Sequence, residues 1–165
     1  MSLSGKTAVI TGSNSGIGLG IATELAKSGA NVILNSFTNR DEDHALAESL
    51  SRDHGITARY IAADLSDGAA ARQLIADAGA CDILVNNAGI QHVAPITEFP
   101  PEKWDQIISI MLNAPFHQHG DTLIHPIADD PAGGRAGMLG FLAHDASPAL
   151  FAPSTVVRLK IPCSQ

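Results

Sequence analysis

The first 116 residues alternate short apolar runs, rich in β-branched residues, with longer segments of helical periodicity. The apolar runs predict four strands, at Thr7–Thr11, Asn31–Asn35, Ala58–Ala63 and Asp82–Asn86. Three segments between them repeat apolar residues every three or four positions, which predicts helices at Gly18–Ser28, Asp41–Ser51 and Asp67–Ala78. Strands that alternate with helices in this way form βαβ units. The pattern therefore predicts an α/β fold with a doubly wound parallel sheet of about four strands.

A further amphipathic helix is predicted from Glu102 to Asn113, where Trp104, Ile107, Ile108 and Met111 form one apolar stripe. Beyond it, from residue 117, prolines are frequent and no period is sustained. We therefore divide the chain into a domain of residues 1–116 and an irregular tail of residues 117–165. Within the tail, only residues 136–144 resemble a helix and residues 154–161 a strand.

The fourth predicted strand would lie at an open edge of the sheet if no strand followed it. Its sequence, Ile83-Leu84-Val85, is apolar throughout. Apolar parallel strands with open edges tend to pair with other chains. We therefore expect the predicted strand at 154–161 to cover part of this edge.

Composition removes several classes of function. The formal net charge of −7 comes without a basic patch, so nucleic acid is not an expected partner. No apolar run approaches the roughly 18 residues that span a bilayer, and the first strand begins by Thr7, so we expect no membrane association, no signal peptide and a cytoplasmic protein. Cys81 and Cys163 lack metal-ligand spacing, and nothing fixes His117, His119 and His125 in a common geometry, so no metal site is predicted.

Candidate chemistry begins at the end of the first strand, in the loop from Thr11 to Gly18. A strand, a glycine-rich loop and a helix in this order offer free helix N–H groups to a pyrophosphate. Gly12 permits a tight turn, Gly16 allows the backbone to approach the phosphates, and Gly18 allows close packing of the helix. The segment is therefore predicted to be the phosphate-binding loop of a Rossmann-type dinucleotide fold.

Features at the ends of the next strands agree with this interpretation. The second strand ends in Asn35-Ser36-Phe37, without a carboxylate for the adenosine ribose, but no Arg or Lys before Arg40 is available in the loop for a 2′-phosphate. This favours NAD over NADP. Phe37 could be an aromatic wall for adenine or an ordinary surface or core residue.

Asp64-Leu65 follow the third strand, where the carboxylate could accept a hydrogen bond from adenine or instead cap the next helix. Asn86-Asn87-Ala88-Gly89 follow the fourth strand. Their small side chains would allow the nicotinamide ribose to lie on the backbone.

These motifs, at these separations, resemble the short-chain dehydrogenase/reductase family over residues 1–117. The segments 86–92 and 99–105 are further similar to bacterial members of that family that act on 3-hydroxybutyrate. The resemblance implies an NAD-dependent oxidoreductase and a homo-oligomer with a short hydroxy acid as substrate, whose carboxylate Gln91 would contact. The residues expected to line the cofactor are Gly12, Ser15, Gly16, Ile17, Gly18, Phe37, Asp64, Leu65, Asn87, Ala88 and Gly89.

The same resemblance implies a catalytic Tyr, Lys, Ser and helix Asn, and this chain does not contain that set. Tyr60 is its only tyrosine and has no Lys four residues on. Met111 occupies the expected Asn position, and Asn113 lies about 200° further round a regular helix. We therefore assign no catalytic residue.

Two origins of the tail remain open, an internal deletion and out-of-frame translation after about Phe116. Three hypotheses of function follow. The chain could be a 3-hydroxybutyrate/acetoacetate oxidoreductase by descent without activity of its own, a non-catalytic dinucleotide-binding or interaction protein, or a defective gene product.

Overall fold

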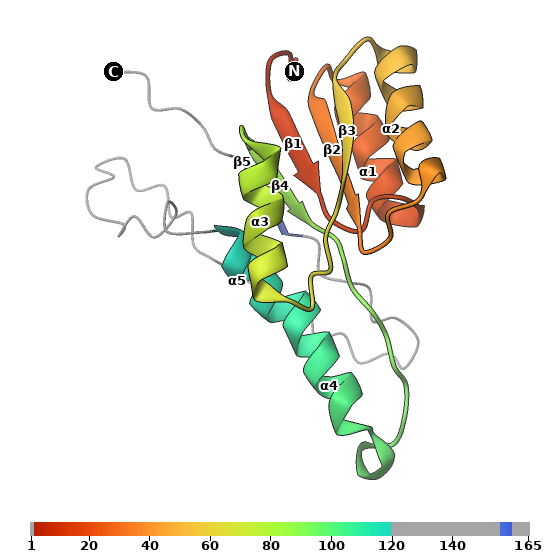
Figure 1. Cartoon of the computed structure of the whole chain (residues 1–165), viewed down its shortest axis with the longest axis vertical. Helices are drawn as coiled ribbons and strands as arrows, with labels where there is room; N and C mark the ends of the chain where they lie inside the picture. Colours follow the sequence, from red (N-terminus) through yellow and green to blue (C-terminus); the bar gives the residue numbers. More distant parts are fainter. Residues whose placement is uncertain (1, 120–155, 160–165) are drawn as a thin grey trace, which may run out of the picture.

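The computed structural model describes residues 2–119 and 156–159, and it begins as a regular alternation of strands and helices (Figure 1). The elements in chain order are β1 Thr7–Ile10, α1 Gly16–Lys27, β2 Asn31–Ser36, α2 Asp41–His54, β3 Ala58–Ala62, α3 Gly68–Ala78, β4 Ile83–Asn86, η1 Ile96–Glu98, α4 Pro101–Ile108, η2 Ser109–Asn113, α5 Ala114–His119 and β5 Val156–Leu159. Each of the four strands and three crossover helices expected from the sequence is present, with ends that differ by a few residues.

The strands form one sheet in the order β3-β2-β1-β4-β5. β1 pairs in parallel with β2 on one side and with β4 on the other, and β2 pairs in parallel with β3. The predicted parallel sheet of the Rossmann type is confirmed. The chain order reverses between β1 and β4, and parallel sheets of this kind bind ligands at the carboxyl ends of the strands at such a reversal.

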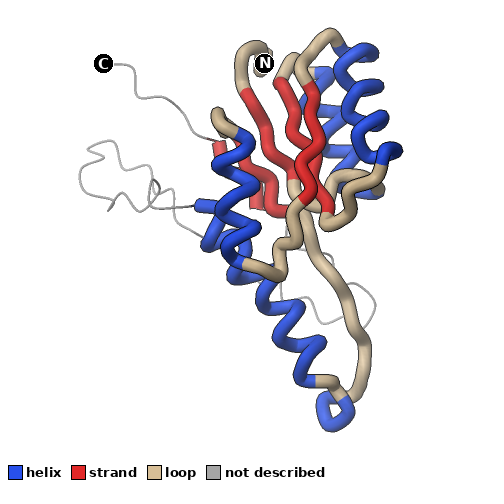
Figure 2. Tube along the Cα trace, viewed as in Figure 1, coloured by secondary structure: helices blue, strands red, loops and turns tan. Residues whose placement is uncertain are grey.

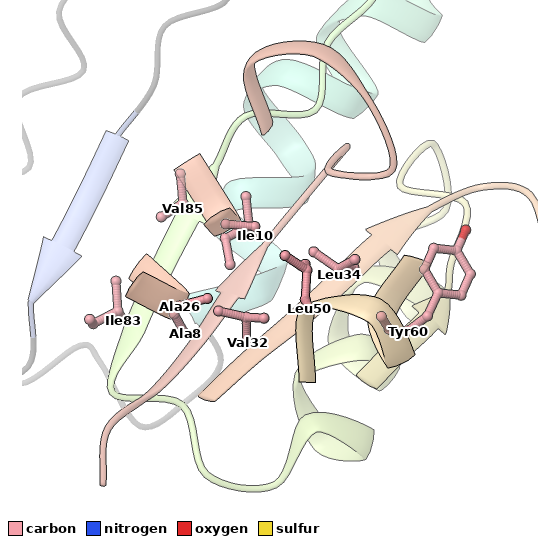
Figure 3. Close-up of a cluster of buried hydrophobic side chains, with 11 residues drawn as sticks. Ala8, Ile10, Ala26, Val32, Leu34, Leu50, Tyr60, Ile83 and Val85 are labelled. Carbon is pink, nitrogen blue, oxygen red and sulfur yellow. The ribbon is translucent and has the colours of Figure 1, made fainter. Parts of the chain in front are cut away.

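Helices cover both faces of the sheet (Figure 2). Alternate strand residues, such as Ala8 and Ile10 of β1, pack with Ala26 of α1 and Leu50 of α2 in one core cluster (Figure 3). The residue between them, Val9, faces the opposite side and packs with α3. This division follows from the two-residue period of a strand, and it explains why buried parallel strands are apolar at nearly every position.

The predicted helix at 102–113 is longer than expected and is not regular. Helical structure runs from Pro101 to His119, but residues Ser109–Asn113 form a π-helical segment between α4 and α5. A π-helix has more residues in each turn than an α-helix. The angle expected between Met111 and Asn113 assumed 3.6 residues per turn, and that assumption is wrong for this segment.

The helix α4 extends away from the sheet, and none of its residues is buried (Figure 1). Its apolar stripe therefore does not join the core. The helix α5 returns to the domain, where Ala114 packs in the same cluster as α3. Within residues 2–119 and 156–159 no helix is long and apolar enough to cross a membrane.

β5 pairs antiparallel with β4, with Leu159 opposite Ile83 and Val156 opposite Asn86. It lies within the range 154–161 expected from the sequence and on the expected edge. α5 continues to His119, so the expected boundary at residue 116 falls inside a helix. The helix expected at 136–144 lies outside the described residues.

Candidate functional site

The predicted phosphate loop connects β1 to α1 at the carboxyl edge of the sheet, and its glycines differ in their surroundings. Gly12 and Gly16 have φ angles of 60° and 57°, which glycine adopts without strain. A Cβ atom at Gly12 would lie 2.9 Å from the Cα of Ala88, whereas one at Gly16 would meet no atom within 4 Å. Gly12 therefore permits contact between two loops, and Gly16 leaves an open side at the start of α1.

Gly18 is in the first turn of α1 and is the most tightly enclosed glycine of the loop. A Cβ atom there would lie 2.4 Å from the carbonyl oxygen of Gly12 and 2.5 Å from Nδ2 of Asn87. From the sequence, Gly18 was expected to allow close packing of the helix. The structure shows that the close neighbours are the backbone of the loop itself and the residue that follows β4.

Two buried polar residues, Ser13 of the loop and Asn35 of β2, hold the same loop in place. The hydroxyl of Ser13 donates to the carbonyl of Ile10 at 2.6 Å and accepts from the backbone N–H of Asn35 at 3.0 Å. Oδ1 of Asn35 accepts from the N–H of Gly12 at 3.4 Å, while its Nδ2 donates to the carbonyl of Ile61 at 3.0 Å. Asn35 therefore ties the phosphate loop to the end of β3 and is too enclosed to contact a ribose.

A second brace joins the loop to the segment after β4. Thr11 Oγ1 accepts from the backbone N–H groups of Asn87 and Ala88, both at 3.0 Å. The side-chain amide of Asn87 donates to the carbonyls of Thr11 and Gly12, also at 3.0 Å. The two loops on either side of the crevice therefore form one hydrogen-bonded unit.

The N-terminus of α1 remains free of side-chain capping. Ser15 is the N-cap residue in extended conformation, and its side chain makes no capping hydrogen bond. Ser15, Gly16 and Ile17 are all exposed, and Ile17 has 64% of its surface accessible. The first N–H groups of the helix and the positive end of its dipole therefore face solvent, an arrangement that suits an anion.

The turn after β2 is organised around the carboxylate of Asp43, whose side chain is only 4% exposed. The Arg40 guanidinium donates to both oxygens, from Nε at 3.2 Å and from a terminal nitrogen at 3.1 Å. Asn14 of the phosphate loop and the hydroxyl of Thr38 donate to the same carboxylate at 3.1 and 2.8 Å. The hydrogen bond from Arg40, with those from Asn14 and Thr38, lowers the pKa of Asp43 well below its ordinary value against the opposing effect of burial.

Tyr60, the only tyrosine of the chain, belongs to this same region. Its ring is buried in the core cluster beneath α2, and its hydroxyl donates to the backbone carbonyl of Thr38. Burial raises the pKa of Tyr60 above its usual value. The Tyr60 hydroxyl therefore holds the turn after β2 in place and is not available to contact a ligand.

The predicted adenine-side residues differ in exposure. Phe37 has 76% of its surface accessible, so it is not a core residue, while Leu65 is buried against α3. Asp64 is exposed and accepts from the N–H and hydroxyl of Ser66 at 2.9 and 2.8 Å. The alternative interpretation of Asp64 as a helix cap is wrong, because α3 is capped by Asp67, which accepts from the N–H of Ala69.

The remaining predicted residues follow β4. Gly89 and Gln91 are exposed in the loop that begins with Asn87, on the edge of the sheet that carries the phosphate loop. Met111 is half-buried in the π segment. In the described part of the chain, no group of three or more His, Cys, Asp or Glu residues could hold a metal ion.

Sequence reasoning did not identify Ser13, Asn35 or Asp43 as organising residues. Ser and Asn are common in loops, so their types carry little signal. Asp43 stands three residues after Arg40 in the first turn of a predicted helix, where acidic residues are usually exposed. Only the tertiary contacts with Asn14 show that its carboxylate is enclosed.

Comparison with known proteins gives a consistent result. The family model described as short chain dehydrogenase matches residues 6–134. D-beta-hydroxybutyrate dehydrogenase from Cupriavidus necator is 54% identical over 119 residues, which is 70% of this chain and 45% of that protein. The enzyme of the same name from Rhizobium meliloti is 47% identical over 68% of this chain and 45% of its own length.

Among solved structures, L-sorbose reductase from Gluconobacter frateurii, complexed with NADPH and L-sorbose, superimposes with a TM-score of 0.68. It is 36% identical, and the match covers 72% of this chain and 46% of that one. The chain thus spans about half the length of the relatives it matches.

Proposed function

This chain belongs to the short chain dehydrogenase family, and on that premise we propose that residues 2–119 form a binding site for a nicotinamide dinucleotide, with NAD as the cofactor. The observation that carries the proposal is the braced phosphate loop with its open helix N-terminus. Hydrogen bonds that Ser13 and Asn87 donate, and one that Asn35 accepts from Gly12, fix the loop before any ligand arrives, so little ordering entropy is lost on binding.

The carboxyl edge of the sheet offers a place for each part of the cofactor. The free N–H groups at Gly16 and Ile17 suit the pyrophosphate, and the open side of Gly16 allows the backbone to approach it. Exposed Phe37 and Asp64 would contact the adenosine, and Leu65 would pack against the adenine ring. Residues 87–89 would carry the nicotinamide ribose.

The family reaction is a hydride transfer between a nicotinamide and a secondary alcohol, a step in which the cofactor supplies the hydride acceptor. The relatives named above make 3-hydroxybutyrate and acetoacetate the proposed substrate pair, with Gln91 toward the substrate carboxylate. The step also needs a group that takes the hydroxyl proton. Tyr60 cannot reach a substrate, because its hydroxyl donates to the carbonyl of Thr38.

Tyr60 specifically favours a second candidate function, that of a non-catalytic dinucleotide-binding protein. No Tyr-x-x-x-Lys sequence occurs in the 165 residues. We therefore expect NAD binding without turnover. Purified protein should form no NADH above background with 3-hydroxybutyrate, and NADH formation that depends on this protein would contradict the expectation.

Binding itself is tested by calorimetry with NAD and a pair of matched variants. Gly16 has positive φ, where Asn and Asp are the best tolerated replacements, so Gly16→Asn and Gly16→Asp carry similar backbone strain and differ in charge. The aspartate would oppose the pyrophosphate and should weaken NAD binding at least about tenfold relative to the asparagine variant. Equal binding by the two variants, or no binding by the unmodified chain at millimolar NAD, would refute the proposal.

We also propose that the chain self-associates. Leu112 and Phe116 are large apolar side chains that lie mostly exposed along the helical stretch 101–119, as does Trp104. Exposed apolar groups on one helix favour association with another copy. Light scattering after size exclusion should give at least twice the mass of one chain, and a monomer at high protein concentration would contradict this.

A further inference from the structure

The region between the phosphate loop and α2 contains one basic side chain that could meet a phosphate on the adenosine ribose. Arg40 and Lys27 are the only Arg or Lys residues between Thr11 and Ser51. Lys27 lies in the last turn of α1 and pairs with Glu24. Arg40 stands four residues after the end of β2, with 55% of its side chain exposed. Among residues 2–119 and 156–159, it is therefore the one Arg or Lys side chain available on this side of the proposed site.

Arg40 is already paired. Its Nε and one terminal nitrogen form a two-pronged contact with the Asp43 carboxylate, and a Glu42 oxygen lies 3.8 Å from Nε. Two-pronged contacts of this kind fix the guanidinium plane as well as its charge. A 2′-phosphate that approached Arg40 would meet two carboxylates together with the cation.

Asp43 cannot turn away from this contact. Its side chain is 4% exposed, and its oxygens also accept from Asn14 and Thr38. The backbone N–H of Arg40 donates to it as well, at 3.3 Å. Five hydrogen bonds from two segments, the loop after β1 and the turn after β2, therefore hold the carboxylate in place, and with it the neutralising charge beside Arg40.

We propose that Asp43 is the residue that makes this site select NAD over NADP, because it holds and neutralises Arg40, the one Arg or Lys side chain beside the adenosine end of the site among the described residues. The inference rests on the proposed dinucleotide function and goes beyond it by assigning the selectivity to a buried carboxylate. Asp43 is here a positioning residue that acts through Arg40. No carboxylate stands at the end of β2, where the side chain of Asn35 is occupied by hydrogen bonds to Gly12 and Ile61. The selectivity is therefore assigned to the pair Arg40 and Asp43.

The test measures NAD and NADP dissociation constants by calorimetry on the full chain. In Asp43→Asn the new side chain has the same shape, but it has one acceptor oxygen where the two Arg40 nitrogens need two. The substitution therefore frees Arg40. We expect the NADP affinity to rise about tenfold relative to NAD, the value of one good charged contact. Asp41→Asn removes the same charge from the same helical turn, where Asp41 is exposed, and should change the ratio less than about twofold.

Two further variants complete the test. Arg40→Ala combined with Asp43→Asn should return the ratio to that of the unmodified chain, because the freed cation is then gone. Arg40→Ala alone should leave the ratio unchanged, and this variant does not depend on whether Asp43→Asn folds.

The possible failures are distinguishable. If the unmodified chain binds NAD but Asp43→Asn leaves the NAD to NADP ratio unchanged, the selectivity proposal is wrong and the binding function stands. The selectivity proposal is also wrong if Arg40→Ala alone weakens NADP binding about tenfold, since Arg40 would then already contact the phosphate. If no variant binds either dinucleotide, the proposed function and this inference both fail.

Discussion

Gly18→Ala is expected to destabilise the chain, although alanine is the better helix former. A Cβ atom at this position would lie 2.4 Å from the Gly12 carbonyl oxygen, 2.5 Å from Nδ2 of Asn87 and 2.9 Å from the Cα of Ser13. Two of these three neighbours are backbone atoms of a loop held by Ser13 and Asn35, so they cannot swing aside. The new methyl group must displace the loop or the helix.

The magnitude follows from the contacts that are lost. Overpacking of an enclosed site costs about 1–3 kcal/mol. Displacement of Asn87 breaks its two hydrogen bonds, to Thr11 and Gly12, at about 1 kcal/mol each. The helix propensity of alanine returns about 1 kcal/mol. The net loss in the free energy of unfolding is therefore about 3 kcal/mol.

Gly20→Ala is the matched control, because Gly20 lies in the same helix and a Cβ atom there would meet nothing within 4 Å. This variant should be more stable than the unmodified chain by about 1 kcal/mol. Urea unfolding followed by circular dichroism measures both differences. The steric explanation is refuted if the free energy of unfolding of Gly18→Ala is within about 1 kcal/mol of that of the unmodified chain, which is the size of the helix propensity effect alone. It is also refuted if both variants lose stability equally.

Three other substitutions test the remaining contacts. Thr11→Val should lower the free energy of unfolding by about 2–4 kcal/mol, because the backbone N–H groups of Asn87 and Ala88 lose their acceptor. An unchanged midpoint of urea unfolding would contradict this expectation. Asn35→Asp should lower the melting temperature, because a buried carboxylate would replace the amide that donates to three carbonyls. Equal melting temperatures of Asn35→Asp and the unmodified chain would argue against the role of Asn35 in holding the loop. Asp43 has a lowered pKa in the folded chain, so the stability it contributes is complete above about pH 4 and is lost as the pH falls toward that pKa. In urea unfolding, the free energies of unfolding of Asp43→Asn and the unmodified chain should therefore converge in acid. A constant difference between them down to low pH would be inconsistent with the ion pair.

Periodicity in the sequence was sufficient for the layered part of the fold. β1, β2 and β4 are buried on both faces, so their apolar runs stand out, and the helices between the strands repeat at helical spacing. The glycine pattern also indicated a tight loop between β1 and α1, since only glycine fits where Gly12 and Gly18 approach other backbone atoms. These are local constraints, and local constraints leave a pattern in one chain segment.

The π segment shows where this reasoning fails. Residues 109–113 satisfy the same helical pattern as α4, and nothing in their types signals an extra residue in the turn. Whether a helix accommodates such a residue depends on what its two ends pack against, and here α5 packs on α3 while α4 extends away. The rotational phase of Met111 was therefore beyond the reach of the sequence.

The sequence by itself determined the parallel sheet, the crossover helices and the place of the glycine-rich loop, because burial and backbone conformation restrict residue type position by position. Only the tertiary structure decided which polar residues are exposed at the candidate site and which brace the loops. Asn35 near the end of β2 and Tyr60 in the middle of β3 are both polar, yet both are buried and donate to carbonyls from other segments. The role of Asp43 likewise depends on Asn14, which lies 29 positions away, and contacts over such separations are created only when the chain folds.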